Sequence, residues 1–119
     1  MLNDELKGQI QTAYRTFLEN KSLKPRYGQR VMIAEVAKVF GNVALDEEGH
    51  RDGDPAVAVI EAGTGTGKTV AYCLAAIPIA RHLGKPLVIS TATVALQEQI
   101  VLKDLPDILR TSGLKFGFS

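Results

Sequence analysis

The chain has 119 residues, 45% of them hydrophobic, and its 14 Lys and Arg side chains nearly balance its 13 Asp and Glu side chains. This length allows at most one domain with an ample apolar core, and the balanced charge excludes a strongly basic, nucleic-acid-binding composition. A single cysteine, Cys73, excludes an internal disulfide and a cysteine metal cluster. Residues 1–24 lack the apolar segment of a signal peptide, and the longest apolar run, residues 71–80, is too short for a membrane span. We therefore expect a cytoplasmic protein with no membrane partner.

Two helices are predicted in the first third of the chain. Asn3 or Asp4 can cap a helix over residues 4–21. Apolar side chains recur along it at helical spacing, namely Leu6, Ile10, Tyr14, Phe17 and Leu18. A turn follows, and a second, broadly apolar helix is expected from about residue 29 to residue 40.

Residues 41–55 are expected to form a loop. Within it, residues 43–48 read Val-Ala-Leu-Asp-Glu-Glu, which imitates the strand and acidic pair that hold magnesium in some phosphate-transferring enzymes. We reject this interpretation because the apolar run is only three residues long.

The most informative stretch is Ala62-Gly63-Thr64-Gly65-Thr66-Gly67-Lys68-Thr69. It lies between an apolar run at residues 56–60, predicted as a strand, and a helix predicted from Lys68 to His82. This is the context of a phosphate-binding loop, and the spacing fits except that Ala62 stands where the strict pattern has Gly. A dinucleotide fingerprint fails, because it requires Gly at the position of Lys68.

The residue types of this stretch suit phosphate chemistry. Glycines allow backbone N–H groups to converge on phosphate oxygens, and the following helix directs its positive end at the anion. Lys68 is expected to reach the β- and γ-phosphates, and the Thr69 hydroxyl is expected to hold Mg²⁺. We therefore take Lys68 and Thr69 as the catalytic candidates and Thr69 as the metal ligand.

The second half of the chain predicts an α/β fold. Residues 86–91 read as a second buried strand, which with residues 56–60 and the intervening helix makes a right-handed unit with a parallel sheet. Residues 103–106 are expected to form a turn, and residues 107–112 a short helix. Residues 114–118 start a third predicted strand. The hydroxyl residues Ser90, Thr91 and Thr93 can cap the next helix or donate to a nucleic-acid phosphate.

Three stretches in this order carry a resemblance to a known family. Residues 26–29 (Arg-Tyr-Gly-Gln), 61–69 and 90–100 are similar to helicase motifs Q, I and Ia. Together with Lys-Asp-Leu-Pro at residues 103–106, they resemble the DinG branch of the XPD-like superfamily 2 helicases over essentially the whole chain. Ala62 agrees with this family, whose motif I commonly opens with Ala.

The resemblance implies an ATP-dependent DNA helicase that loads on single-stranded DNA and moves 5′ to 3′, with ATP and Mg²⁺ as cofactors. It maps the adenine-reading glutamine onto Gln29, a neighbouring adenine-side arginine onto Arg26, and the phosphate loop onto residues 62–69. The DNA path maps onto Ser90, Thr91, Thr93 and Gln97.

The resemblance also implies a domain plan. Residues 1–24 are an amino-terminal helical segment, and residues 25–119 are the first part of an incomplete RecA-like motor domain, a parallel sheet with flanking helices. The family's four iron–sulfur cysteines, its Asp-Glu-x-His box and its second RecA-like domain do not occur in this sequence. We therefore expect an amino-terminal piece of a longer helicase, which holds nucleotide without unwinding DNA.

Two alternatives remain open at this point. The chain can belong to a different phosphate-binding-loop enzyme, such as a small-molecule kinase or a non-helicase ATPase, or it can be a non-catalytic folded remnant. In either case an incomplete parallel sheet leaves an unpaired edge, so self-association through that edge is expected.

Overall fold

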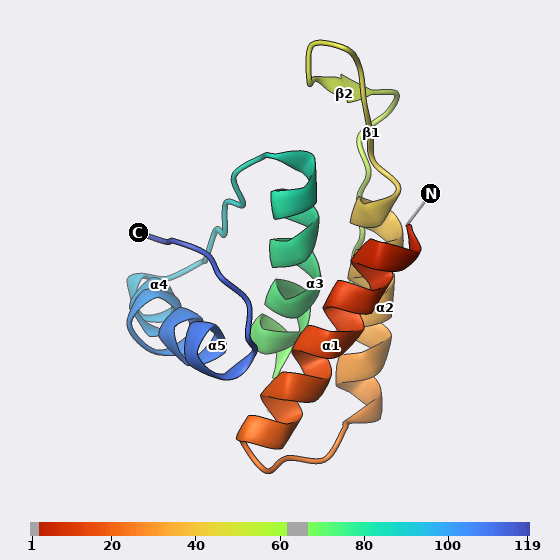
Figure 1. Ribbon diagram of the computed structural model, residues 1–119. Helices are drawn as coiled ribbons and strands as arrows, with labels where there is room; N and C mark the ends of the chain where they lie inside the picture. Colours follow the sequence, from red (N-terminus) through yellow and green to blue (C-terminus); the bar gives the residue numbers. More distant parts are fainter. Residues whose placement is uncertain (1–2, 62–66) are drawn as a thin grey trace.

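The computed structural model describes residues 3–61 and 67–119, and helices dominate them (Figure 1). The elements in chain order are α1 (Asp4–Asn20), α2 (Tyr27–Gly41), β1 (Ala44–Leu45), β2 (Arg51–Asp52), α3 (Lys68–Leu83), α4 (Val94–Gln99), η1 (Ile100–Asp104) and α5 (Leu105–Thr111). None of the described helices is long and apolar enough to cross a membrane.

The first two predicted helices are confirmed. Asn3 caps α1, because its Oδ1 accepts a hydrogen bond from the Leu6 backbone N–H at 2.6 Å. The apolar face expected on α1 is buried apart from Tyr14, which is half-buried. Periodic apolar residues and a capping side chain therefore define α1 from local sequence alone.

Helix α3 forms the centre of the core. It packs against both α1 and α2, and α1 also contacts α5 (Figure 1). The side chains of Cys73 and Leu74 on α3 and of Ile108 on α5 are completely buried. A helix that is apolar on most of its surface is stable only when neighbours cover it, which explains this central position.

Glycines mark both ends of α3. Gly67 before the helix has φ 71°, and Gly84 after it has φ 67°, so both lie in the left-handed region that favours glycine. Gly84 ends α3 one residue beyond the predicted end at His82, and Pro78 lies buried inside the helix.

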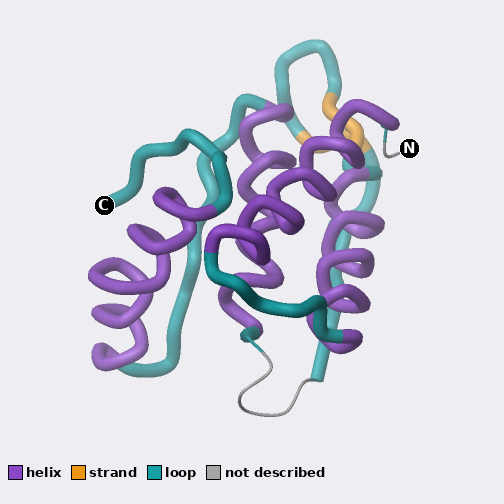
Figure 2. The backbone as a smooth tube through the Cα atoms, turned by 60° about the horizontal axis from the view of Figure 1, so that its bottom comes forward, coloured by secondary structure: helices purple, strands orange, loops and turns teal. Residues whose placement is uncertain are grey.

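The predicted parallel sheet is wrong. Residues 56–60 and 86–91 form no ladder, and the described chain holds only the antiparallel pair β1–β2, with Ala44 opposite Asp52. Both apolar segments run as loops, as does the predicted strand at residues 114–118 (Figure 2). The RecA-like fold class is therefore corrected to a helical assembly.

The physical reason lies in what covers the apolar segments. A parallel pair is stable when helices cover both of its faces. In this structure the helices bury their apolar faces against one another instead. Consequently Val57 and Val59 are 72% and 94% exposed, and Val88 is 83% exposed.

Two loop expectations have different outcomes. The turn expected at residues 103–106 is wrong, because the π-helical η1 joins α4 to α5 there without a break. Residues 43–48, where a metal motif was rejected, include β1 and the start of the turn that follows it. The Asp46 carboxylate accepts hydrogen bonds from the backbone N–H groups of Glu48 and His50, each at 2.9 Å, and so holds the β1–β2 turn.

Candidate nucleotide-binding cleft

A cleft of about 540 Å³ lies at the start of α3. Lys68, Thr69 and Tyr72 from the first two turns of α3 line it, together with Ser90 and Thr91 from the segment before α4. Its apolar wall comes from α2 and the neighbouring loop, through Met32, Val36, Phe40, Ala58 and Ile60. The structure therefore brings the predicted Lys-Thr pair next to two of the predicted hydroxyl residues. Two other clefts, of about 790 and 840 Å³, contain none of the predicted site residues.

The Thr69 hydroxyl is oriented by Tyr72. Burial raises the pKa of the Tyr72 hydroxyl, and a hydrogen bond between the Thr69 and Tyr72 side chains partly offsets that rise. A hydroxyl oxygen has two lone pairs, so the Thr69 oxygen can also bind a hard cation such as Mg²⁺.

Asp104 is a negative group in the same cleft. It is half-buried at the end of η1, and its charge raises the pKa of both Tyr72 and Cys73, although burial is the larger cause in each case. The cleft therefore combines a lysine, a carboxylate and hydroxyl groups. This donor set fits a magnesium–phosphate ligand better than an anion alone, because a bare phosphate would be repelled by Asp104.

Gln29 lies outside this cleft but contacts the end of the predicted phosphate loop. It is 8% exposed in the first turn of α2, and its Nε2 donates to the Gly67 carbonyl oxygen at 3.5 Å. Its Oε1 accepts from the Tyr14 hydroxyl at 3.1 Å. Arg26 is the residue before α2, with its backbone N–H donating to the same hydroxyl at 3.3 Å.

The remaining predicted phosphate-loop residues, 62–66, lie outside the described residues. Gly67 is described, and it precedes α3 without a side-chain cap on that helix. A helix that binds a phosphate at its start needs free N–H groups in its first turn. Gly67 has no side chain that could accept hydrogen bonds from these groups in α3.

The predicted DNA-contacting residues are only partly gathered. Ser90 and Thr91 line the cleft, whereas Thr93 and Gln97 are exposed around the start of α4. Thr93 caps α4 by accepting from the Leu96 N–H at 3.2 Å, and Thr91 donates to the Thr93 carbonyl oxygen at 3.0 Å. The capping role predicted for these hydroxyls is thus confirmed for Thr93.

Sequence reasoning missed Tyr14, Tyr72 and Asp104. The helical spacing predicts Tyr14 on the apolar face of α1, where a tyrosine hydroxyl usually finds a polar partner, and that rule is the signal for Tyr14. The sequence predicts Asp104 in a turn. A π-helical segment, which is frequent at functional sites, leaves no clear sequence signal.

Comparison with known proteins finds that this chain is similar to segments of much longer proteins. No protein-family model matches it. It is 41% identical to a protein of Photobacterium profundum over an alignment of 121 positions that covers 99% of this chain. It is 46% identical to a protein of Escherichia coli and 44% identical to one of Salmonella typhimurium, over 88% of its length in both cases.

The particular family follows from the names of these relatives. Each of the three is an ATP-dependent DNA helicase DinG. The resemblance to the DinG helicases is therefore confirmed, and the chain is homologous to a segment of such a protein. It spans 16% of the length of the Photobacterium relative and 13% of the Escherichia coli relative.

Proposed function

We propose that this chain is the ATP-holding part of an ATP-dependent DNA helicase that moves 5′ to 3′ on single-stranded DNA. The observation that carries the proposal is the cleft in which Lys68 and Thr69 meet Ser90 and Thr91, in a chain homologous to named ATP-dependent helicases. Lys68 would contact the β- and γ-phosphates, and residues 62–67 would surround them with backbone N–H groups.

Magnesium fits the residues of this cleft. The Thr69 oxygen would bind the ion directly, and Asp104 would attract it by charge. When bound, Mg²⁺ would neutralise phosphate charge. Among the described residues, no three His, Cys, Asp or Glu side chains are grouped to hold a metal, so the nucleotide's own phosphates must supply further ligands.

We expect binding without appreciable turnover by this chain. Phosphoryl transfer requires a complete metal site and a group that orients the attacking water, and the cleft provides one carboxylate for both tasks. Steady ATP hydrolysis by the isolated chain that is abolished by Lys68→Ala would contradict this part of the proposal.

Calorimetry with MgATP tests the site itself. Lys68→Ala should weaken binding about 10-fold or more, equal to about 1.4 kcal/mol, because a cation beside the phosphates is lost. Lys38→Ala, an exposed lysine on α2, is the matched control and should bind like the parent chain. Equal affinity of both variants would reject the site. A folded chain without any binding would favour a non-catalytic remnant.

The nucleic-acid side of the proposal has a separate test. Ser90 and Gln97 are exposed and are proposed to contact the phosphates of one DNA strand. Fluorescence anisotropy with a single-stranded oligonucleotide should show weaker binding for the Ser90→Ala, Gln97→Ala double variant than for Gln11→Ala, an exposed glutamine on α1. Equal binding would remove these residues from the proposed DNA path.

A further inference from the structure

Tyr14 connects α1 to two positions at the start of α2 through one hydroxyl group. It lies on α1, accepts from the Arg26 backbone N–H at 3.3 Å and donates to the Gln29 Oε1 at 3.1 Å. A phenol has one donor and two acceptor positions, so both bonds can form together. The side chain thus fixes the start of α2 and the Gln29 carboxamide at once.

The Gln29 carboxamide in turn covers the last glycine of the phosphate loop. A Cβ added at Gly67 would lie 2.1 Å from the Gln29 Nε2, which is closer than any real contact. The amide therefore occupies the space that a side chain at position 67 would need. The side chain of Gln29 thus contacts the backbone of Gly67, which lies 38 positions further along the chain.

Tyr14 and Gly67 together determine which way this amide points. With Oε1 held by the tyrosine hydroxyl, Nε2 faces the Gly67 carbonyl oxygen and donates to it. The flipped amide would place two oxygens against each other at Gly67. The Gly67 carbonyl therefore selects the orientation, and the tyrosine hydroxyl holds Oε1 in that orientation before any ligand binds.

We propose that Tyr14 is a positioning residue for recognition of the adenine base, acting through the Gln29 carboxamide. The two protein bonds use one Oε1 lone pair and one Nε2–H, so one acceptor and one donor remain. A carboxamide pairs with adenine through the base's amino group and N7, whereas guanine presents an acceptor in place of that amino group. The inference rests on the proposed ATP-binding function and adds how its base preference is set.

The experiment compares the affinities for MgATP and MgGTP by calorimetry. The parent chain should prefer ATP, and Gln29→Ala should lose the preference. Tyr14→Phe keeps the ring and removes the hydroxyl, so the preference should fall by about 3- to 10-fold, the range of one neutral hydrogen bond. Thr12→Val, which removes an exposed hydroxyl from the same helix, is the matched control and should keep the full preference.

A double-mutant cycle separates positioning from packing. If Tyr14 acts through Gln29, adding Tyr14→Phe to Gln29→Ala should change the ATP-to-GTP ratio no further. A purely structural role would lower the melting temperature and leave this ratio unchanged. The side-chain amide resonances of Gln29 give a second, nucleotide-free measurement, and Tyr14→Phe should shift them.

The outcomes distinguish the two proposals. Loss of ATP preference in Gln29→Ala but not in Tyr14→Phe would overturn the positioning role and leave the proposed function intact. Unshifted Gln29 amide resonances in Tyr14→Phe would also overturn it. A parent chain that binds ATP and GTP equally would overturn base reading by Gln29, and the positioning role with it.

Discussion

Two separate constraints require glycine at position 67, just before α3. Gly67 needs a left-handed backbone, and the Gln29 amide also excludes any side chain there. A glycine-to-alanine change at this position would therefore meet both backbone strain and a steric overlap. The local sequence explains the first constraint, and only the tertiary structure reveals the second.

Cys73 provides a pH-dependent prediction at this scale. The side chain is completely buried on α3, and burial, assisted by the charge of Asp104, raises the pKa of the thiol from 9.0 to about 12. The unfolded chain therefore releases this proton first as the pH rises. The contribution of Cys73 to stability is intact below about pH 9 and is lost progressively between about pH 9 and 12, by up to about 1.4 kcal/mol per pH unit.

Urea unfolding at a series of pH values measures this effect. Since other groups also titrate in this range, the informative quantity is the difference in unfolding free energy between the parent chain and Cys73→Ala. This difference should shrink or reverse as the pH rises from about 9 toward 12. A constant difference, or rapid alkylation of Cys73 in the folded chain at pH 8, would contradict a buried thiol of high pKa.

At the scale of elements, the sequence predicts helices well and strands poorly. The helices α1 and α3 have end signals in the chain itself, Asn3 before α1 and Gly84 after α3. A strand cannot be predicted from local sequence in this way, because its backbone N–H and C=O groups need a neighbouring strand to pair with. The runs at residues 56–60 and 86–91 have strand-like composition but no ladder partner among the described residues.

In the candidate site, too, the local features were predictable and the tertiary contacts were not. The position of Lys68 and Thr69 at the first turn of a helix was predictable, because a glycine-rich turn precedes an apolar helical run. Their placement in one cleft with Asp104 was not predictable, because a π-helical segment joins α4 and α5 where the sequence predicts a turn. The bond from Tyr14 to Gln29 spans 15 positions and depends on how α1 packs beside α2.

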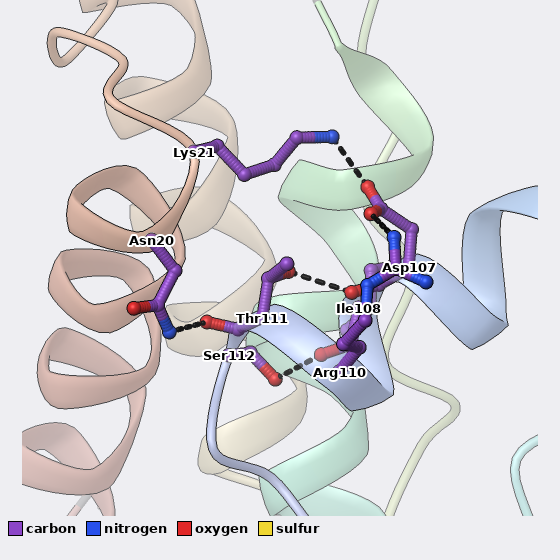
Figure 3. Close-up of polar contacts among 7 residues, drawn as sticks. All are labelled: Asn20, Lys21, Asp107, Ile108, Arg110, Thr111 and Ser112. Carbon is purple, nitrogen blue, oxygen red and sulfur yellow. Dashed lines mark hydrogen bonds and ion pairs between the residues drawn. The ribbon is translucent and has the colours of Figure 1, made fainter.

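A second prediction concerns how α5 is attached to α1 (Figure 3). The Asn20 Nδ2 donates to the Thr111 carbonyl oxygen at 2.9 Å, and the Lys21 Nζ pairs with the Asp107 carboxylate at 2.5 Å. Thr111 is 8% exposed, whereas the Lys21 side chain is 35% exposed. The neutral bond should therefore contribute more to stability than the ion pair, which solvent screens.

Urea unfolding of three variants checks this order. Asn20→Ala should lower the free energy of unfolding by about 1 kcal/mol, because a nearly buried carbonyl group loses its partner. Lys21→Ala should cost less, since exposed pairs contribute about 0–1 kcal/mol and Asp107 keeps its bond to Arg110. Glu19→Ala, exposed on the same turn of α1, is the control and should stay within about 0.5 kcal/mol. A larger loss for Lys21→Ala than for Asn20→Ala would contradict this view of the α1–α5 contact.

The molecule exposes apolar side chains, and its net charge is too small to keep copies of the chain apart. Its formal net charge is only +1, so repulsion between copies is weak. Val57, Val59 and Val88 are all strongly exposed on segments that form no strand ladder with the described part of the chain. The sheet edge expected from the sequence is absent among the described residues, but these segments offer the same chemistry to a second copy of the chain.

We therefore predict concentration-dependent self-association through residues 56–60 and 86–89. Sedimentation velocity should show dimers or larger species at high concentration. The Val59→Lys, Val88→Lys double variant should remain monomeric at the same concentration, because charge opposes pairing of extended segments.

Leu102→Lys is the matched control, because Leu102 is 75% exposed on η1 and is distant from both segments in the sequence. This variant should associate like the parent chain. A strictly monomeric parent chain at high concentration would refute the prediction. Equal loss of association in Leu102→Lys would show that net charge, rather than these two segments, controls the equilibrium.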